Sequence, residues 1–463
     1  MLDGERYRAS LDDGRAIYFE GERVASLAKH PLLGRAVDTV AAGYDHWYSP
    51  APDARNPLLG VTASGADLQA VLPLFDEADA LLSLTYQTVM CLLTASSRIG
   101  GTDGGRYAER MAEHVRHLQT EDLRSALCIT DAKGNRSLPP LRQEDPDAYT
   151  RVVARRPDGV VIRGAKLHIT AGPLAHEFLV MPTKAMHAGE GDYAICCSVP
   201  VGSPGVKVVC RTSAPRADDT RDYPVSHQGV LPEGFVIFDD VFVPHERVFL
   251  DGEVEHAAVF AHSLGLWERL KALTHLADEA DLLVGLAQLT AEANGLAKIS
   301  HIREKVNDII IYATLVRAGL VAAVHHATVT PDGLAVPDEK FTNAAKFYGA
   351  ENYAVMIRHL HDIAGGSVVT APSTADLDNP ETGPLLDKYM ATGNGVTGRY
   401  RTALMHAIRD LTADTAGGHR AVIQLQAGGG LFAQRLVTRK HYDLAAAKRR
   451  ALDRTGLAGP APE

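Results

Sequence analysis

The CxxC motif is absent from this sequence. The chain has 463 residues and five cysteines, and no two of them form a CxxC pair. An odd number of cysteines without a CxxC pair is typical of reduced thiols in a cytosolic protein and argues against a disulfide framework. Cys196 and Cys197 lie in the apolar run YAICCSVP, where we expect buried structural thiols. We therefore expect a cytoplasmic protein.

An excess of basic charge is also lacking, since 47 Lys and Arg stand against 57 Asp and Glu, for a net charge of -10. Proteins that bind nucleic acids or anionic membranes need a basic face, so we expect neither kind of partner. No window offers the roughly 20 uncharged apolar residues of a membrane span. The charged start, MLDGERYRASLDDGR, has no apolar segment of a signal peptide.

Several catalytic motifs are missing as well. The sequence contains no P-loop, GxSxG or HExxH motif. Its close histidines, His325 with His326 and His359 with His361, lack the spacing and carboxylate support of a zinc site. We therefore expect no metal site.

What the sequence does contain is a periodicity that changes twice. Up to residue 138, stretches such as ADLQAVLPLFDEADALLSLTYQTVMCLLTASSRI repeat apolar residues every three or four positions, which predicts helices. Residues 139–266 hold short β-branched runs, such as GVVIRGAKLHIT and GFVIFDDVFVP, that predict an antiparallel sheet or barrel. Residues 267–463 return to long amphipathic helices. We predict an α+β fold with a helical domain (1–138), a β domain (139–266) and a helical bundle (267–463).

Several blocks resemble the 4-hydroxyphenylacetate 3-hydroxylase family. SLDDGRAIYFEGERV, followed by HPLL and YD, is similar to its N-terminal signature. The blocks TDAKGNRSLPP, GVVIRGAKLHITAGPLAHEFLVMPT, VIFDDVFVPHERVF, NGLAKISHIREKV and DIAGGSVVTAPSTADLDNP look closer to its 4-hydroxybutyryl-CoA dehydratase branch. The resemblance implies an acyl-CoA dehydrogenase-like fold, FAD between the β domain and the C-terminal bundle, and a homotetramer, a dimer of dimers.

The two branches differ in chemistry. The hydroxylases take reduced FAD from a separate reductase and use oxygen to hydroxylate a phenol, whereas the dehydratases use FAD and a [4Fe-4S] cluster on a CoA thioester. The resemblance implies three Cys and one His as cluster ligands. Here Cys91 is alone, the remaining ligand positions hold about Glu268 and His275, and a nearby Tyr corresponds to about Ala272. Thiolates hold such clusters, so we expect no iron–sulfur cluster.

The phenol-binding residues implied by the hydroxylase branch are replaced too. An Arg, a Tyr and a His of that branch correspond to roughly Thr85, Val89 and Leu127, and none of these can bind a phenolate in that way. Our leading hypothesis is a two-component FAD monooxygenase that has a flavin reductase as partner. Its small-molecule substrate would be an aromatic compound or a specialised metabolite, and it could be free or held on CoA or a carrier. The alternatives are a cluster-free flavin dehydratase, isomerase or dehydrogenase of a CoA thioester, and a scaffold-like protein that binds FAD weakly or not at all.

The resemblance places the loop after GAKLHIT against the flavin. Thr170 can donate a hydroxyl hydrogen bond to the isoalloxazine, and Ala171 and Gly172 let the backbone approach the ring closely. In the loop TDAKGNR, Thr130 and Arg136 are candidate cofactor residues, because a guanidinium can grip a phosphate or carboxylate with two hydrogen bonds. The alternative is an ordinary strand turn for the first loop and a surface turn closed by Asp and Gly for the second.

Two glycine-rich stretches, AGGS and QAGGG, offer backbone N–H groups to a pyrophosphate. We expect Gly365, Gly366 and Ser367 of the first, and Gly428 and Gly429 of the second, to bind the cofactor. Neither stretch is a GxGxxG fingerprint, so a Rossmann site is not indicated. Each stretch also fits the glycine that ends a helix.

Three residues are catalytic candidates. Glu233 precedes the strand GFVIFDD, where a carboxylate can act as a general base. His275 lies on a helix where relatives place their chemistry, and Thr170 matches a group in the dehydratase active site. An exposed strand-edge glutamate and a structural histidine are the competing interpretations of Glu233 and His275.

Overall fold

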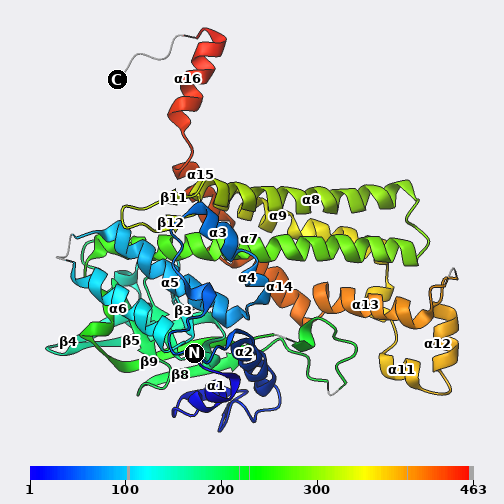
Figure 1. Ribbon diagram of the computed structural model, residues 1–463, viewed down its shortest axis with the longest axis horizontal. Helices are drawn as coiled ribbons and strands as arrows, with labels where there is room; N and C mark the ends of the chain where they lie inside the picture. Colours follow the sequence, from blue (N-terminus) through cyan, green and yellow to red (C-terminus); the bar gives the residue numbers. More distant parts are fainter. Residues whose placement is uncertain (102–104, 218, 229, 394, 458–463) are drawn as a thin grey trace.

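A mainly helical stretch, a stretch that supplies most strands of two β-sheets, and a helical stretch follow one another along the chain, as the periodicity predicts. The structure is a computed structural model that describes residues 1–101, 105–217, 219–228, 230–393 and 395–457 (Figure 1). The mixed α+β class is therefore confirmed. The positions of the domain boundaries stay predictions.

The N-terminal stretch is mainly helical. Its longest helix, α5, begins after Asp79, whose side chain accepts hydrogen bonds from the N–H groups of Leu81 and Leu82, and ends at Gly100, where φ is +64°. Apolar residues surround α5, and the Trp267 indole of a later helix donates to Thr94 within it, at 2.8 Å. The helices are α1 (Gly4–Ser10), α2 (Leu33–Trp47), α3 (Gly65–Val71), α4 (Leu74–Glu77), α5 (Ala80–Ile99) and α6 (Arg106–Thr120).

A six-stranded sheet forms most of the β part, in the order β2-β1-β8-β9-β5-β4. Its strands are β1 (Ala16–Phe19), β2 (Glu22–Arg23), β4 (Arg151–Arg156), β5 (Gly159–Thr170), β8 (Val206–Arg211) and β9 (Glu233–Pro244). The sheet is not purely antiparallel, because β1 runs parallel to β8. Both β1 and β2 come from the start of the chain, where two short runs gave too little periodicity to predict strands.

A second sheet has four strands in the order β10-β7-β6-β3. Its strands are β3 (Ser125–Cys128), β6 (Glu177–Val180), β7 (Ile195–Pro200) and β10 (Val248–Asp251). β3 runs parallel to β6 and is also drawn from the N-terminal stretch. A buried ion pair joins the two sheets, since Lys166 Nζ of β5 lies 2.7 Å from Asp131 and donates to the carbonyl of Met181, which follows β6.

One face of the six-stranded sheet is buried and the other is open. Along β8 and β9, Val208, Val236 and Phe238 alternate inward into the core, while Val209 and Phe235 point outward and are 43% and 42% exposed. This alternation follows from the two-residue period of a strand. The open face is where the candidate site lies.

Three long helices make up the centre of the C-terminal part: α7 (Val254–Ala293), α8 (Ser300–His325) and α9 (Glu339–Ala364). They pack on one another through apolar stripes, and β11 (Thr328–Val329) pairs with β12 (Ala335–Val336) between α8 and α9. The remaining helices are α10 (Ser367–Thr370), α11 (Thr374–Asp378), α12 (Gly383–Met390), α13 (Gly398–Thr412), α14 (Thr415–Gln426), α15 (Gly430–Lys440) and α16 (Leu444–Thr455). In Figure 1, α16 projects away from the body.

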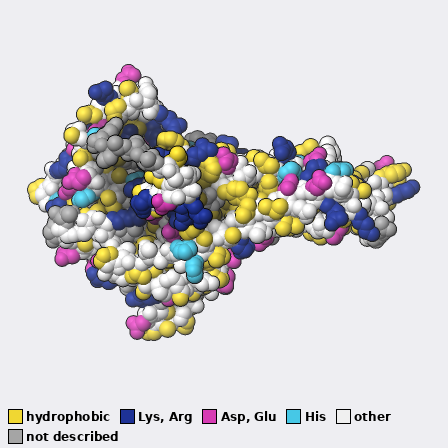
Figure 2. Space-filling view, turned by 90° about the horizontal axis from the view of Figure 1, so that it is seen from above, with side chains coloured by type: hydrophobic (Ala, Val, Ile, Leu, Met, Phe, Trp, Pro, Cys, Tyr) yellow, Lys and Arg dark blue, Asp and Glu magenta, His cyan; other side chains and the backbone are white. Residues whose placement is uncertain are grey.

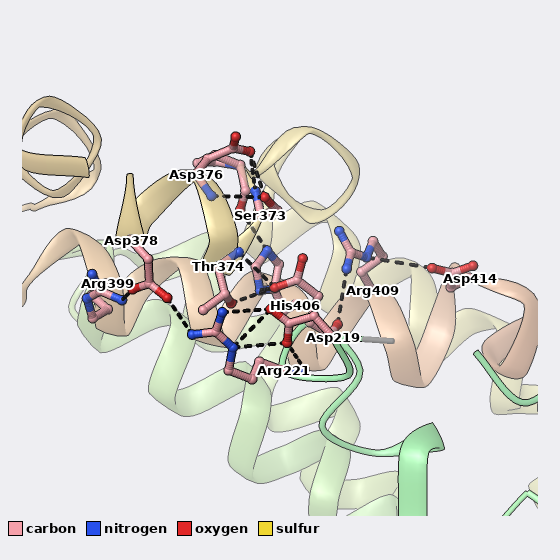
Figure 3. A network of polar contacts seen from close by, with 12 residues as sticks. Asp219, Arg221, Ser373, Thr374, Asp376, Asp378, Arg399, His406, Arg409 and Asp414 are labelled. Carbon is pink, nitrogen blue, oxygen red and sulfur yellow. Dashed lines mark hydrogen bonds and ion pairs between the residues drawn. The ribbon is translucent and has the colours of Figure 1, made fainter. Parts of the chain in front are cut away.

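A polar network fastens the segment before β9 to the C-terminal helices (Figure 3). Asp222 accepts hydrogen bonds from the N–H and hydroxyl of Thr374, and its Oδ1 lies 3.2 Å from His406 Nδ1. Asp410 of α13, which is buried, accepts from the N–H groups of Val225 and Ser226, both at 2.8 Å. Residues 222–226 are therefore attached to α11 and α13.

Two helices are long and apolar enough to cross a membrane by length and composition, α5 and α8. In α5, 72% of the most apolar 18-residue segment is buried inside the protein, which marks α5 as a core helix. In α8 the share is 39%, because one side packs on α7 and α9 and the other faces outward. These two helices are weak candidates for membrane spans, and the fold is consistent with a soluble protein.

Candidate active site

A polar row crosses three neighbouring strands at one end of the open sheet face. Glu233 of β9 pairs directly with Thr170 of β5 on one side and with Arg211 of β8 on the other. Residues that are direct partners across strands lie on the same face of a sheet. Three side chains from three separate parts of the sequence are thereby brought together.

Hydrogen bonds fix the centre of this row. The Thr170 hydroxyl lies 3.0 Å from each carboxylate oxygen of Glu233. His419 Nε2 of α14 lies 3.3 Å from Glu233 Oε1 on the other side. Glu233 and His419 keep 21% and 35% of their side chains exposed, so the group is accessible. The sequence predicts that Thr170 donates to a flavin, but here its one hydrogen is directed at Glu233.

The turn after Thr170 is tight. Ala171 is fully buried with φ at +57°, and its N–H donates to the Pro232 carbonyl at 2.8 Å. Gly172 begins a short 3₁₀ turn (Gly172–Leu174), and a Cβ there would lie 3.2 Å from Ile169 Cγ2. The turn thus needs a small residue and holds Thr170 at the strand end. Contact of Ala171 and Gly172 with a cofactor stays a prediction.

An apolar surface adjoins the polar row. Val209 and Phe235 are direct partners one step further along β8 and β9, on the same open face. The surface is apolar at Val209 and Phe235 and polar at the adjoining row. It therefore matches a flat aromatic ring system that has hydrogen-bonding groups along one edge. The residues present therefore fit the isoalloxazine of a flavin.

A cavity of about 590 Å³ opens beside the row. Its walls come from the ends of β1 and β8, the segment after β8, and the corner between α13 and α14. Arg211 lines it, together with Asp410, Asp414 and Thr415. The cavity gives a larger ligand polar space next to Glu233.

A second polar cluster lies next to α14, around the buried carboxylate of Glu279 in α7. Tyr353 donates its hydroxyl to this carboxylate, and Gln424 Nε2 donates to it at 2.7 Å. Arg420 Nη1 lies 3.5 Å from the same carboxylate. Because Arg420 follows His419, α14 presents one side chain to each cluster.

His275 lies at the edge of this second cluster. Its Nε2 is 3.7 Å from Glu279 Oε2, and half of its side chain is exposed. Partial burial and the charges of Lys271 and Arg420 lower its pKa, so the imidazole is neutral and weakly basic. The structure places it on α7 with Glu279, and not within the Thr170–Glu233 pair. Its catalytic role stays a prediction.

The loop TDAKGNR lies beside β5. The Thr130 carbonyl accepts a hydrogen bond from the N–H of Leu167 at 2.7 Å, which puts Thr130 close along the strand to Thr170. Arg136 lies further along the loop and is exposed. Thr130 is partly buried, and the roles of both residues stay predictions.

The glycine stretch at 428–429 packs against α7. The Gly428 carbonyl accepts from Arg269 Nε at 2.7 Å, and a Cβ at Gly428 would lie 2.7 Å from Arg269 Cγ. Gly428 and Gly429 also have φ values of +76° and +93°. Close packing and backbone conformation are therefore sufficient reasons for glycine here, and pyrophosphate binding by these two residues stays a prediction.

The stretch at 365–367 follows α9. Gly365 ends the helix with φ at +77° and donates its N–H to the His361 carbonyl at 2.8 Å. Cβ atoms built at Gly365 and Gly366 would meet nothing within 4 Å, so Gly365, Gly366 and Ser367 lie at an open surface. In Figure 1, α11 and α12, which follow this stretch, lie at the opposite end of the molecule from the sheets. Their contact with a cofactor stays a prediction.

The positions that correspond to the cluster ligands do not fit an iron–sulfur cluster. Cys91 is fully buried, with Sγ 3.7 Å from the Phe260 carbonyl, and burial raises its pKa to about 12. Burial also raises the pKa of Glu268, which lies near the N–H of Gly428. Across the described ranges, no group of three or more His, Cys, Asp or Glu side chains could hold a metal ion.

The phenol-binding positions are occupied by core residues. Thr85 is fully buried, donates to the Leu81 carbonyl at 2.8 Å and accepts from the N–H of Ser125 at 3.0 Å. Val89 is fully buried and Leu127 is 9% exposed. These side chains offer a substrate no free polar atom.

Five residues of these two clusters are not predicted by the sequence: His419, Arg420, Glu279, Tyr353 and Gln424. All five lie on amphipathic helices, where a lone polar residue has no distinguishing spacing. His419 and Arg420 occur in AGGHRAVIQ, between two glycines and an apolar run. Only the three-dimensional packing of α14 between β9 and α7 gives them partners.

Comparisons with known proteins cover nearly the whole chain. Residues 81–250 match the N-terminal domain of 4-hydroxyphenylacetate 3-hydroxylase, and residues 257–454 match its C-terminal domain. The chain is 29% identical to the 4-hydroxyphenylacetate 3-monooxygenase oxygenase component of Thermus thermophilus, over 88% of this chain and 87% of that protein.

Solved structures give the same result. An oxygenase component of 4-hydroxyphenylacetate 3-monooxygenase complexed with FAD has a TM-score of 0.87 at 27% identity, covering 97% of this chain and 98% of that one. A 4-hydroxybutyryl-CoA dehydratase from N. maritimus has a TM-score of 0.88 at 27% identity, covering 100% and 96%. A probable acyl-CoA dehydrogenase from Mycobacterium abscessus shares the fold at a TM-score of 0.50 and 16% identity, covering 94% and 96%. The acyl-CoA dehydrogenase-like architecture is therefore confirmed.

Proposed function

Because the chain belongs to the 4-hydroxyphenylacetate 3-hydroxylase family, we propose that it is an FAD-dependent monooxygenase. In this proposal it is the oxygenase component of a two-component system. A separate flavin reductase supplies reduced FAD, and the enzyme uses O₂ to hydroxylate or oxidise an aromatic or specialised-metabolite substrate. FAD supplies the oxygen chemistry, and the protein supplies binding, orientation and exclusion of water.

The observation that carries this proposal is the accessible Thr170–Glu233–His419 group beside an apolar sheet face, in a chain that matches an FAD-bound oxygenase component along its length. Thr170 and Glu233 would meet the polar edge of the flavin ring. Val209 and Phe235 would lie against its apolar part and keep water away from it. No metal is needed for these roles.

We further propose that the cofactor site is completed by a second subunit in a homotetramer. Gly365, Gly366 and Ser367 lie at an open surface, where they can meet the cofactor of a neighbour. The outward side of α8 supports self-association, because Ile311 and Val321 there are 55% and 60% exposed. Figure 2 shows hydrophobic side chains gathered along the arm of long helices.

The substrate in this proposal is not simple 4-hydroxyphenylacetate. Thr85, Val89 and Leu127 replace the groups that the hydroxylase branch uses on a phenol, and all three are core residues. A differently shaped small molecule, free or held on CoA or a carrier, fits the cavity beside Arg211 better. Five buried free cysteines support a cytoplasmic location, where a soluble reductase is also available.

A second candidate function is a cluster-free reaction on a CoA thioester. It is favoured by the match to the dehydratase and by Glu233, a carboxylate placed to take a proton from a substrate beside the ring. His275 is the other candidate base, and its lowered pKa makes it the weaker one. In this reaction FAD would stay bound and no reductase would be required.

Oxygen and product measurements separate the candidates. We expect oxygen consumption and an oxygenated product when the protein is mixed with FAD, NADH, a flavin reductase and a panel of phenols, free or as CoA esters, and no product when the reductase is omitted. Turnover of a CoA ester without reductase and without oxygen would favour the second function. Failure to bind FAD in either redox state would leave a scaffold-like protein.

A further inference from the structure

Two cationic side chains lie beside His275 in the second polar cluster. Lys271 and His275 are four residues apart on α7, so they project from the same side of that helix. Arg420 reaches the cluster from α14, where its Nη1 is 3.5 Å from Glu279 Oε2, the oxygen that lies 3.7 Å from His275 Nε2. Burial and the charges of Lys271 and Arg420 lower the pKa of His275, because both cations lie near the imidazole. The three side chains therefore converge.

The carboxylate of Glu279 does not fully occupy Arg420. Tyr353 donates its hydroxyl to Glu279 Oε1, and Gln424 Nε2 donates to Oε2 at 2.7 Å. Arg420 Nη1 stays at 3.5 Å, which is longer than a normal N–H···O hydrogen bond. Its Nε is buried and has no hydrogen-bond partner among the described residues. Because buried donors are normally paired, the guanidinium keeps hydrogen-bonding capacity for a ligand.

Lys271 is the second available cation. Its side chain is partly buried, and no ion pair or hydrogen bond of its ammonium group is found within the described ranges. Burial lowers its pKa, and the charges of Asp278 and Glu268 offset this effect only in part. Asp278 is paired with Arg317 at 3.6 Å, and burial raises the pKa of Glu268. Lys271 is therefore free to pair with an anionic ligand.

The charge of this group suits a monoanion. With His275 neutral, the two cations stand against the single carboxylate of Glu279, which leaves one net positive charge. A carboxylate balances this charge, whereas a phosphate dianion exceeds it. A guanidinium can donate two parallel hydrogen bonds to a carboxylate, and an ammonium group and an imidazole N–H can donate to the same oxygens.

We propose that Lys271, His275 and Arg420 bind a free carboxylate of the substrate. The inference deepens the proposed function and rests on it, because it narrows the substrate to an acid whose carboxyl group is not esterified to CoA or a carrier. His419, which precedes Arg420 on α14, contacts Glu233. The carboxylate site and the proposed flavin site therefore share this helix.

The test compares acids with their own amides, which have the same shape and no charge. Calorimetry of the assembled protein, with and without FAD, measures the affinity for benzoate, phenylacetate and phenylpropanoate and for the three amides. At least one acid should bind about tenfold more tightly than its amide, the effect of one charge-assisted hydrogen bond. Lys271→Gln should remove about this factor from the acid and leave the amide unchanged, whereas Lys271→Arg keeps the charge and should keep most of the preference.

Lys388→Gln is the matched control, because Lys388 is exposed on α12 and should not affect the affinity for acids. An acid preference that is lost in Lys271→Gln and kept in Lys271→Arg and Lys388→Gln supports the inference. Equal wild-type affinity for acids and amides, no binding of any acid, or a preference that Lys271→Gln retains would overturn it.

The proposed function is tested separately by the same protein. Reductase-dependent oxygenation of substrates without a carboxylate, at the rates seen with acids, would overturn the inference and leave the proposed function intact. Acid binding that depends on Lys271 in a protein that binds no FAD would overturn the proposed function, and the carboxylate site would then serve another reaction.

Discussion

At the scale of single residues, buried polar side chains are satisfied by partners distant in sequence. His176 is one such residue. Its Nδ1 accepts from the N–H of Arg124 at 2.9 Å, and its Nε2 lies 2.9 Å from the Ser10 hydroxyl, which itself donates to the Tyr7 carbonyl. This pattern requires a neutral imidazole with its hydrogen on Nε2.

Stability should therefore fall on mild acidification. Burial, together with the charges of Arg15 and Arg124, lowers the pKa of His176 to about 3. Since the folded pKa is below the unfolded value of about 6.5, the unfolded chain takes up the proton first, and stability is lost as pH falls from 7 toward 3. For this group alone the loss between pH 7 and pH 5 is about 2 kcal/mol.

Urea unfolding at the two pH values checks this expectation. In His176→Asn, the side-chain oxygen can replace Nδ1 as acceptor but does not titrate, so the difference between pH 7 and pH 5 should shrink by about 2 kcal/mol. An unchanged difference in the variant would show that His176 is not the titrating group.

The Glu279 carboxylate should matter for stability more than surface carboxylates do. Replacing it by Gln leaves Tyr353, Gln424 and Arg420 competing for a single acceptor in a buried site. We expect a loss of about 3 kcal/mol in the free energy of unfolding. Glu351→Gln, at an exposed ion pair with Arg435, is the control and should change it by less than about 1 kcal/mol. Equal effects of the two variants would contradict this account.

At the scale of elements, the segment before β9 is held by side chains of the C-terminal helices. Figure 3 shows the polar contacts between them. Asp410 of α13 is the buried anchor, since it accepts from the N–H groups of Val225 and Ser226 and from the Ser226 hydroxyl. This attachment holds the segment that precedes β9, whose register is given by its pairing with β5 and β8.

Asp410→Ala should loosen this segment without unfolding the sheets. Hydrogen–deuterium exchange should increase at least several-fold within residues 219–228, because three hydrogen bonds onto the segment are lost. Exchange in the β5 core should stay as in the wild type. Protection retained in 219–228 would show that the remaining contacts, such as Asp222 with Thr374, suffice.

The sequence predicted elements well where periodicity was sustained. The helical stripe from Ile302 to Val324 became α8, and GVVIRGAKLHIT became β5. It missed β1, β2 and β3, because strands of two to four residues carry too few alternations to be recognised. The family resemblance was sufficient to single out Thr170 and Glu233 as candidates. His419 could not be predicted, because Glu233 lies 186 residues earlier in the sequence and only the packing of α14 brings the two together.

At the scale of the whole molecule, the long helices leave an apolar side unpaired. Ile311 and Val321 of α8 are exposed, and an open groove of about 630 Å³ runs along α7 and α8. A single chain seldom leaves a contiguous apolar surface on a helix uncovered, which supports assembly through this arm.

Val321→Asp should disrupt that assembly. A charge buried in a subunit interface without a partner costs several kcal/mol, so light scattering after size exclusion should show a species smaller than the wild type. Leu141→Asp, an exposed position outside the helical arm, is the control and should leave the size unchanged. A wild-type mass for Val321→Asp would indicate that this face of α8 is not an interface.

The central claim is that FAD binds between the open sheet face and the helices of a neighbouring subunit. The most direct measurement is an experimental structure of the assembled protein with reduced FAD, solved anaerobically. We predict the isoalloxazine over Val209 and Phe235, its polar edge within hydrogen-bond distance of Thr170, and its pyrophosphate at the glycines of the partner subunit's Gly365–Ser367 stretch. FAD bound away from Thr170, or held by one chain alone, would contradict the account.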